Sequence, residues 1–421
     1  MDVFFIMNDS QRLMEEHMRK SLVPMLSVLI AVSLGLSLIP QSALSASKAD
    51  VKEWTLLVFL NGHNNLDSFG AKDINEMEKV GSSDQVNVVV QWASMKNRDT
   101  RRLYVQRDAS TTTVTSPVVQ SMPRVDMGDP RNFVEFVRWG MENYPAKKYF
   151  VDVWDHGSGW HLSADDVQAR DISWDDYTGN SISTEELGQA VRELRAITGQ
   201  KISLYGSDAC LMAMAEVGSE IAEGAEFMVG SQDLEPGDGW PYDGILSRLG
   251  AKADASAQEL GAMVVEAYVA SYSGGSQGRQ DVTQSVVNLE RSKELHAALA
   301  ELGTSLRLLG KEERTRVIKA SVDALNFYYA DYVDLGDFVS QLEKSRIPSL
   351  DSALISNVRQ AIDDYVVSSS ATGRFQAAQG ISVWVPNYKS TYNRYIERYR
   401  GLSFHQETAW GDTLQYLLQD L

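Results

Sequence analysis

Two residues of this chain have the types and positions that nucleophilic chemistry requires. The 421 residues include one cysteine, Cys210, and six histidines. A single thiol cannot form an internal disulfide, and as a nucleophile it needs a base, which histidine supplies near neutral pH. Cys210 comes shortly after the apolar run 202–205, and His156 comes directly after the apolar run 149–154. Both residues therefore follow the end of an expected strand.

If these two strands are neighbours in a parallel sheet, His156 and Cys210 converge at one edge of that sheet. Gly157 has no side chain, so its N–H and that of Cys210 could stabilise the oxyanion of an acyl-transfer intermediate. We expect a helix from Leu211 that helps to hold a thiolate. The alternatives are a small buried cysteine and a common His-Gly turn.

The elements that must position this pair alternate along the first half of the chain. Apolar runs at 54–60, 86–92, 149–154, 202–205 and 227–230 predict buried strands. Helical patterns fall between them at 67–80, 130–143 and 183–194, the last with a Ser183–Glu186 capping box. The sequence therefore predicts an α/β fold, a mostly parallel sheet with helices on both faces.

The remaining segments suggest how the chain is divided. Residues 1–45 resemble a signal peptide, with Met18 as an alternative initiator, an apolar run and a small-residue cleavage site. An uncleaved membrane anchor is the alternative. We expect a catalytic α/β domain at 46–250. Residues 251–421 are expected to be mainly helical, packed on the sheet, and to return one strand, 380–385, to the core.

Composition excludes several classes of partner. The net charge of −18 argues against nucleic acid or an anionic membrane as a partner. It is compatible with basic substrates and equally with solubility alone. We expect an exported monomer, periplasmic or extracellular, that meets a membrane only through its signal segment. With one cysteine it has no disulfide framework.

Two motifs extend these observations. The segments Trp-Asp-His-Gly-Ser-Gly-Trp at 154–160 and Ser-Asp-Ala-Cys-Leu-Met at 207–212 resemble those of the clostripain family of cysteine peptidases. Further stretches at 54–66, 127–130, 143–146 and 231–240 are similar to family segments. The resemblance implies the caspase-like fold that legumains and gingipains share. It also implies His156 as general base, Cys210 as nucleophile, and the Gly157 and Cys210 amides as the oxyanion hole.

Members of this family cleave after arginine or lysine, and an acid two residues before the nucleophile lies in the specificity pocket. That position is Asp208 here. A buried carboxylate would pair with a cationic side chain and reject neutral ones. Asp233 and Asp238 are weaker candidates for the same pocket. The alternative for Asp208 is a turn residue or a helix cap.

The resemblance also raises activation and cofactors. Family members are often made inactive and cleaved between the His and the Cys; Arg170 is the basic residue there that falls in an expected loop. No cofactor is required, and some relatives use calcium. Asp171, Asp175 and Asp176 could supply oxygen ligands, although a solvated acidic loop is favoured. His63 stands at a position where we expect an aspartate in the family. For His63 itself, a role as a surface turn residue is favoured over one at the rim of the pocket.

We therefore expect an exported cysteine endopeptidase that cleaves after Arg or Lys and acts through an acyl-enzyme intermediate. Self-cleavage could activate it. A catalytically silent family member acting as a binding module is the first alternative. The second is a metal-dependent hydrolase with Asp155, His156 and His161 as ligands, although their spacing matches no common metal motif.

Overall fold

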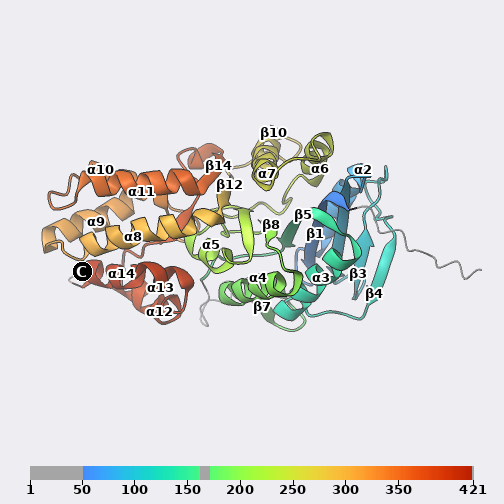
Figure 1. Cartoon of the computed structure of the whole chain (residues 1–421), viewed down its shortest axis with the longest axis horizontal. Helices are drawn as coiled ribbons and strands as arrows, with labels where there is room; N and C mark the ends of the chain where they lie inside the picture. Colours follow the sequence, from blue (N-terminus) through green and yellow to red (C-terminus); the bar gives the residue numbers. More distant parts are fainter. Residues whose placement is uncertain (1–50, 162–170, 420–421) are drawn as a thin grey trace, which may run out of the picture. The chain divides into compact units, whose positions relative to one another are not determined.

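A nine-stranded sheet forms the centre of the fold (Figure 1). The computed structural model describes residues 51–161 and 171–419, all within one unit, 49–421. The strand order is β14-β12-β9-β8-β5-β1-β2-β3-β4. The strands are β1 (Lys52–Gly62), β2 (Val86–Ser94), β3 (Asp99–Tyr104), β4 (Val118–Met122), β5 (Ala146–Trp154), β8 (Ile202–Asp208), β9 (Ala225–Gly230), β12 (Thr283–Asn288) and β14 (Val366–Ala371).

The predicted α/β class is confirmed, with parallel strands in the middle of the sheet. β9, β8, β5, β1 and β2 pair in parallel, while β12 and β14 at one edge and β3 and β4 at the other are antiparallel. β1 shows why this sheet is buried on both sides. Leu56 and Val58 belong to one apolar core, and Leu57 and Phe59 belong to the core on the opposite face. Alternation along an apolar strand therefore supplies both layers.

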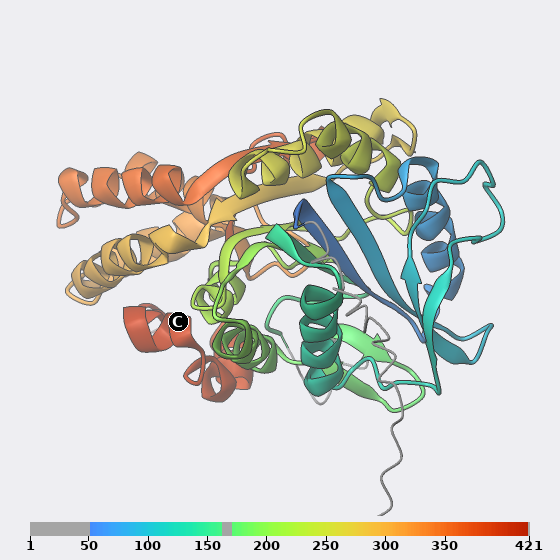
Figure 2. The ribbon, with the colours of Figure 1, turned by 45° about the vertical axis from the view of Figure 1, so that its right-hand side comes forward.

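Helices cover both faces (Figure 2). Residues of α2, α6 and α7 belong to the core that contains Leu56, and residues of α3, α4 and α5 to the core that contains Leu57. The predicted Ser183–Glu186 capping box begins α4. The bounds are α2 (Asp67–Val80), α3 (Pro130–Asn143), α4 (Thr184–Thr198), α5 (Ala215–Ile221), α6 (Tyr242–Ala251) and α7 (Ala257–Tyr272).

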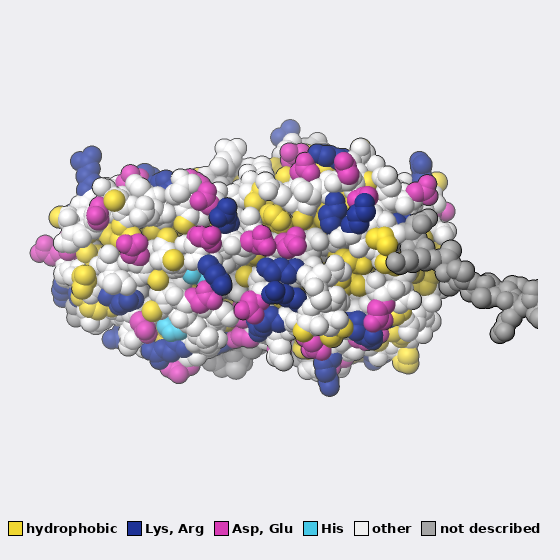
Figure 3. Space-filling view, viewed as in Figure 1, with side chains coloured by type: hydrophobic (Ala, Val, Ile, Leu, Met, Phe, Trp, Pro, Cys, Tyr) yellow, Lys and Arg dark blue, Asp and Glu magenta, His cyan; other side chains and the backbone are white. Residues whose placement is uncertain are grey.

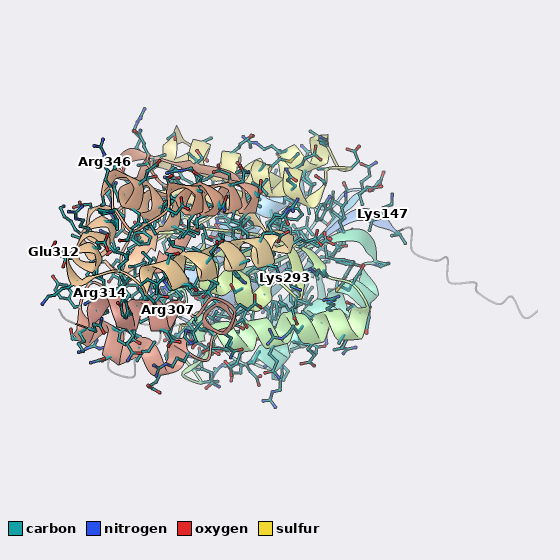
Figure 4. The ribbon with its side chains drawn as sticks, turned by 60° about the vertical axis from the view of Figure 1, so that its left-hand side comes forward. Lys147, Lys293, Arg307, Glu312, Arg314 and Arg346 are labelled. Atoms are coloured by element: carbon teal, nitrogen blue, oxygen red, sulfur yellow. The ribbon has the colours of Figure 1, made fainter. Side chains whose placement is uncertain are left out.

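The later part of the chain is mainly helical and shares the core of α3 to α5. Arg307 and Arg314, labelled in Figure 4, both contact α14: Arg307 donates to Thr413 Oγ1 at 2.6 Å, and Arg314 lies over the Tyr416 ring at 4.8 Å. The helices are α8 (Ser292–Leu306), α9 (Lys311–Asp323), α10 (Leu335–Lys344), α11 (Ser352–Tyr365), α12 (Lys389–Tyr399), α13 (Ser403–Thr408) and α14 (Trp410–Leu418).

Two elements of this later part differ from the expected pattern. β12 was not expected, and α11 ends at Tyr365, so that residues 366–371 form β14 instead of continuing a helix. The expected strand at 380–385 is β15 (Ser382–Trp384), which pairs with β13 (Tyr332–Asp334) and not with the nine-stranded sheet. Two further small sheets join β6 (Ile172–Asp175) to β7 (Asn180–Ile182) and β10 (Ser273–Gly275) to β11 (Gly278–Arg279).

Acidic and basic side chains are interspersed on the face shown in Figure 3, with apolar atoms between them. The negative net charge of the chain is therefore not gathered into one continuous field on this face. Among the residues that the structure describes, none of the helices has the length and apolar character needed to cross a membrane.

Candidate active site

The sheet brings His156 and Cys210 to the same level of one edge. β5 and β8 are parallel neighbours, which is the condition under which the two residues were expected to converge, and Trp154 is the register partner of Asp208. His156 and Cys210 each lie two residues beyond that register pair. The N–H of Asp155 continues the pairing by donating to the Asp208 carbonyl at 3.2 Å.

Both residues line one cavity of about 650 Å³. Gly157 and Asp208 line it as well, so four of the predicted site residues meet there. Asp233 and Asp238 are not among its lining residues. The cavity is lined by Asn65, Leu66, Trp154, Asp155, His156, Gly157, Ser158, Asp176, Asp208, Ala209, Cys210, Leu211, Leu234, Glu235, Pro236, Gly237, Gly239, Tyr328 and Tyr329.

His156 is oriented by a residue that sequence reasoning missed. Its Nε2 lies 2.8 Å from Asn65 Oδ1. Because an amide oxygen can only accept, this contact places a proton on Nε2 and leaves Nδ1 as the basic atom. Asn65 lies in the turn after β1, where Asn64 Nδ2 also donates to Asp155 Oδ1 at 2.6 Å. The run of asparagines ending this strand was the available signal.

Cys210 is a neutral thiol in this arrangement. Burial, together with the nearby charges of Asp233 and Asp208, raises the pKa of Cys210 to about 11. The backbone N–H of Glu235 donates to Sγ at 3.2 Å. A base must therefore remove the proton before the sulfur can attack.

The expected helix from Leu211 is wrong. α5 begins at Ala215 and is seven residues long, and Leu211 has a left-handed backbone with φ of 65°. The Leu211 N–H donates to the Asp233 carbonyl at 3.1 Å, and the Ala213 N–H to the Ser231 carbonyl at 2.9 Å. Residues 211–213 thus bond to the segment after β9 and not to a helical turn. The next helix, α5, therefore begins five residues after the nucleophile and not directly behind it.

Two backbone N–H groups beside the sulfur are available for a ligand. Among the described residues, no backbone carbonyl accepts from the Gly157 or the Cys210 N–H, and the Cys210 N–H interacts with its own Sγ. Gly157 lies so close to the nucleophile segment that a Cβ would be 2.6 Å from the Cys210 carbonyl oxygen. The turn therefore requires glycine at this position.

Asp208 presents a buried carboxyl group to the cavity, with 5% of the residue exposed. Its Oδ2 accepts from the Trp240 N–H at 3.2 Å and the Tyr242 hydroxyl at 2.9 Å. Gly239, with φ of 56°, packs against the carboxyl group, where a Cβ would lie 3.0 Å from Oδ2. Burial raises the pKa of Asp208 to about 6. The same Tyr242 hydroxyl lies 2.7 Å from Asp152 Oδ2, and burial raises the pKa of Asp152 to about 8.

Asp233 and Asp238 have other partners. Asp233 accepts from the Tyr328 N–H at 2.8 Å and lies 3.3 Å from Arg374 Nη2. Asp238 pairs with Lys72 at 2.6 Å, and both side chains are about 40% exposed. Asp233 therefore ties the loop of Tyr328 to the segment beside Cys210, and Asp238 forms a surface ion pair.

The expectation that His63 is a surface turn residue is wrong. His63 is fully buried, and its Nδ1 lies 2.8 Å from Asp175 Oδ2. Asp171 instead contacts Arg398 at 3.5 Å, and Asp176 lines the cavity. These acids do not fit a shared calcium site. In residues 51–161 and 171–419, no three His, Cys, Asp or Glu side chains are grouped so that they could hold a metal ion.

Asp155 and His161, two of the alternative metal ligands, have separate partners in the structure. Burial lowers the pKa of His161 to about 3, and its ring stacks on Tyr395. Asp155 accepts from Asn61 and Asn64. Arg170 and the signal segment 1–45 lie outside the described residues.

Comparisons with known proteins all find members of the clostripain family. The model of the clostripain family, Peptidase_C11, matches residues 58–417. Clostripain of Hathewaya histolytica is 24% identical over 423 residues, covering 85% of this chain and 79% of that protein.

Two solved structures share the fold. A secreted C11 cysteine protease from Bacteroides thetaiotaomicron, in complex with an irreversible peptide inhibitor, has a TM-score of 0.67 and 19% identity, covering 86% of this chain and 99% of that one. An inactive zymogen C11 protease from Parabacteroides distasonis has a TM-score of 0.64 and 18% identity, covering 85% and 98%.

Proposed function

The chain belongs to the clostripain family of cysteine peptidases, and from this premise we propose that it is an exported endopeptidase that cleaves after Arg or Lys. The observation that carries the proposal is the cavity in which His156, Cys210 and the carboxyl group of Asp208 meet. A base and a thiol suit acyl transfer, and a buried carboxyl group suits a cationic side chain.

The reaction follows from the protonation states. His156 takes the Cys210 proton at Nδ1, because Asn65 engages Nε2, and Sγ attacks the scissile carbonyl carbon. The N–H groups of Gly157 and Cys210 donate to the oxyanion. His156 then protonates the leaving amine, and a thioester remains. Water hydrolyses this acyl-enzyme with His156 as base, which regenerates the thiol.

Specificity arises from desolvation. A cationic side chain that enters the cavity pairs with Asp208, whose Oδ2 is already fixed by Trp240 and Tyr242. A neutral side chain would keep the Asp208 carboxyl group buried without supplying a charge to compensate it, which is the stronger source of rejection.

Export and activation complete the proposal. Residues 1–45 act as the signal segment, and the mature chain is released to a periplasm or to the outside. Cleavage after Arg170 activates the enzyme. The relative described as an inactive zymogen is consistent with such a step.

One assay tests the function. Wild type and Cys210→Ala are compared on fluorogenic peptides with Arg, Lys or Asp before the cleaved bond, each with a thiol alkylator or a chelator. Cleavage after Arg or Lys that falls to background in Cys210→Ala and with alkylator supports the proposal. Cleavage that survives Cys210→Ala, or that only the chelator abolishes, contradicts it. Absence of all cleavage, before and after limited proteolysis, supports the silent binding module.

A further inference from the structure

A second acidic side chain lines the same cavity. Glu235 lies in the loop after β9, whereas Asp208 ends β8, so separate segments bring the two together. Glu235 Oε1 accepts from the Trp240 indole N–H at 3.3 Å. Its Oε2 is buried and receives no hydrogen bond from a donor among the described residues. One oxygen of this carboxyl group therefore lacks a donor in the free protein.

The two carboxyl groups are within hydrogen-bond reach of each other. Two acids in contact cannot both ionise in a buried site, so the pair retains a proton. Burial, followed by the charge of Asp208, raises the pKa of Glu235 well above its usual range. The hydrogen bond to Glu235 opposes the effect of burial on the pKa of Asp208. In the free cavity Glu235 is therefore the protonated partner, and it donates to Asp208.

The surroundings favour a positive ligand. The groups that act on the pair come from β5, α2, α6, α7 and the nucleophile segment. They are Asp152, Asp73, Tyr242, Tyr268, Tyr272 and Cys210. These groups are acidic or neutral, and Lys72 is engaged with Asp238 on the surface. His156 lines the same cavity. A cation between the two carboxyl groups would lower the pKa of Glu235, so that this residue loses its proton.

We propose that Glu235 is a second specificity-determining residue, and that a substrate Arg or Lys side chain binds between Glu235 and Asp208 with release of their shared proton. This inference rests on the proposed function. The balance is simple: the neutral acid and the cation become a carboxylate–cation pair, and one proton passes to solvent. Arg depends on the pair more than Lys, because a guanidinium can donate to both carboxylates at once.

Glu235→Gln is the informative variant. Glutamine keeps an oxygen to accept from Trp240 and an N–H to donate to Asp208, and the backbone N–H that reaches Cys210 Sγ is unaffected. Asp243→Asn is the matched control, since it also removes one acidic charge but from an exposed pair with Lys79 outside the cavity. Thermal unfolding of both variants checks that they are folded.

Kinetics give the first readout. In Glu235→Gln, kcat/KM for Arg peptides falls roughly 10- to 100-fold, mainly through KM, as expected for one charged hydrogen bond. The loss for Lys peptides is smaller, and Asp243→Asn changes neither. In the wild type, KM for Arg peptides falls as pH rises toward the raised pKa of Glu235, because binding expels a proton, and this slope flattens in the variant. Equal kinetics in the two variants would overturn the inference.

Calorimetry gives a readout that does not require turnover. A peptide amide ending in Arg is titrated into Cys210→Ala, with and without Glu235→Gln, in buffers of different ionisation enthalpy. Release of about one proton that disappears with Glu235→Gln supports the inference, whether or not the enzyme cleaves the peptide. Binding without proton release, or release unchanged by Glu235→Gln, overturns it. Absence of Arg and Lys cleavage in the wild type contradicts the proposed function instead.

Discussion

His156 has its tautomer set by one neutral side chain. Asn65 Oδ1 accepts from Nε2 at 2.8 Å, which places the proton of the neutral ring on Nε2 and makes Nδ1 its basic nitrogen. An amide orients the ring without adding a charge beside it. The next residue, Gly157, must approach the Cys210 carbonyl closely. The oriented imidazole of His156 and this glycine together line the part of the cavity beside the sulfur.

We predict that Asn65→Ala lowers kcat about 10- to 100-fold with little change in KM, the size found for loss of an orienting hydrogen bond to a functional histidine. Asn65→Asp restores the acceptor and adds a negative charge, which raises the pKa of His156. The base then stays protonated to higher pH, so the acid limb of the kcat profile moves upward. Full kcat in Asn65→Ala would show that this contact is dispensable.

Among single residues, His156 and Cys210 could be predicted from the sequence because each follows a strand, and the structure brings both to one cavity. The sequence could not show which acidic residue of the loop after β9 faces that cavity. Which of them faces the cavity depends on backbone turns such as the left-handed Gly239, and the alternation of side chains gives no guide in a loop. Glu235 was missed for that reason, while Asp233 and Asp238 were named.

Among the elements, the loop that contains Tyr328 depends on Asp233. This carboxylate, 4% exposed as a residue, binds the Tyr328 N–H and Arg374, while the Asp233 carbonyl accepts from Leu211 beside the nucleophile. One residue thus joins three segments around the cavity rim.

We predict that Asp233→Ala lowers the free energy of unfolding by about 1–3 kcal/mol, because it removes charged hydrogen bonds and leaves the Tyr328 N–H without its acceptor. KM rises for Arg and Lys peptides alike, since the rim loosens, and the ratio between the two substrates is unchanged. Urea unfolding and paired kinetics measure both effects. A changed Arg-to-Lys ratio at unchanged stability would instead assign Asp233 to the specificity pocket.

The long apolar strands and capped helices of the first half could be predicted, because their patterns are local. β12 and β14 could not. Their sequences, Thr-Gln-Ser-Val-Val-Asn and Val-Val-Ser-Ser-Ser-Ala, are short and half polar, and their pairing is with each other and with β9. Contacts distant in sequence decide such strands, and propensity over six residues does not.

On the scale of the whole chain, the two segments that flank residues 162–170 are firmly held. Before them, the ring of His161 stacks on Tyr395 of α12 at 4.1 Å. After them, Asp171 is 2% exposed and contacts Arg398, which also binds Glu185 at 2.7 Å. After cleavage at Arg170, one fragment would therefore contact α12 through His161 and the other through Asp171.

We predict that the mature enzyme separates into two fragments on a denaturing gel but runs as one species under native conditions. Arg170→Ala abolishes the fragments and the rise in activity that accompanies them. Arg192→Ala, which alters an arginine of α4 in the same interval, leaves processing intact. Identical fragments from Arg170→Ala, or full activity of the intact chain, would contradict this prediction.

The register of β5 and β8 has a consequence for such a nicked molecule. His156 lies on one fragment and Cys210 on the other, and in the central sheet the five strands of the first fragment join the four strands of the second through the pairing of β5 with β8. Once the fragments have been separated, recovery of activity becomes a bimolecular event. The rate of this recovery then depends on protein concentration. Dilution of the separated fragments would therefore slow the return of activity, although no residue has been altered.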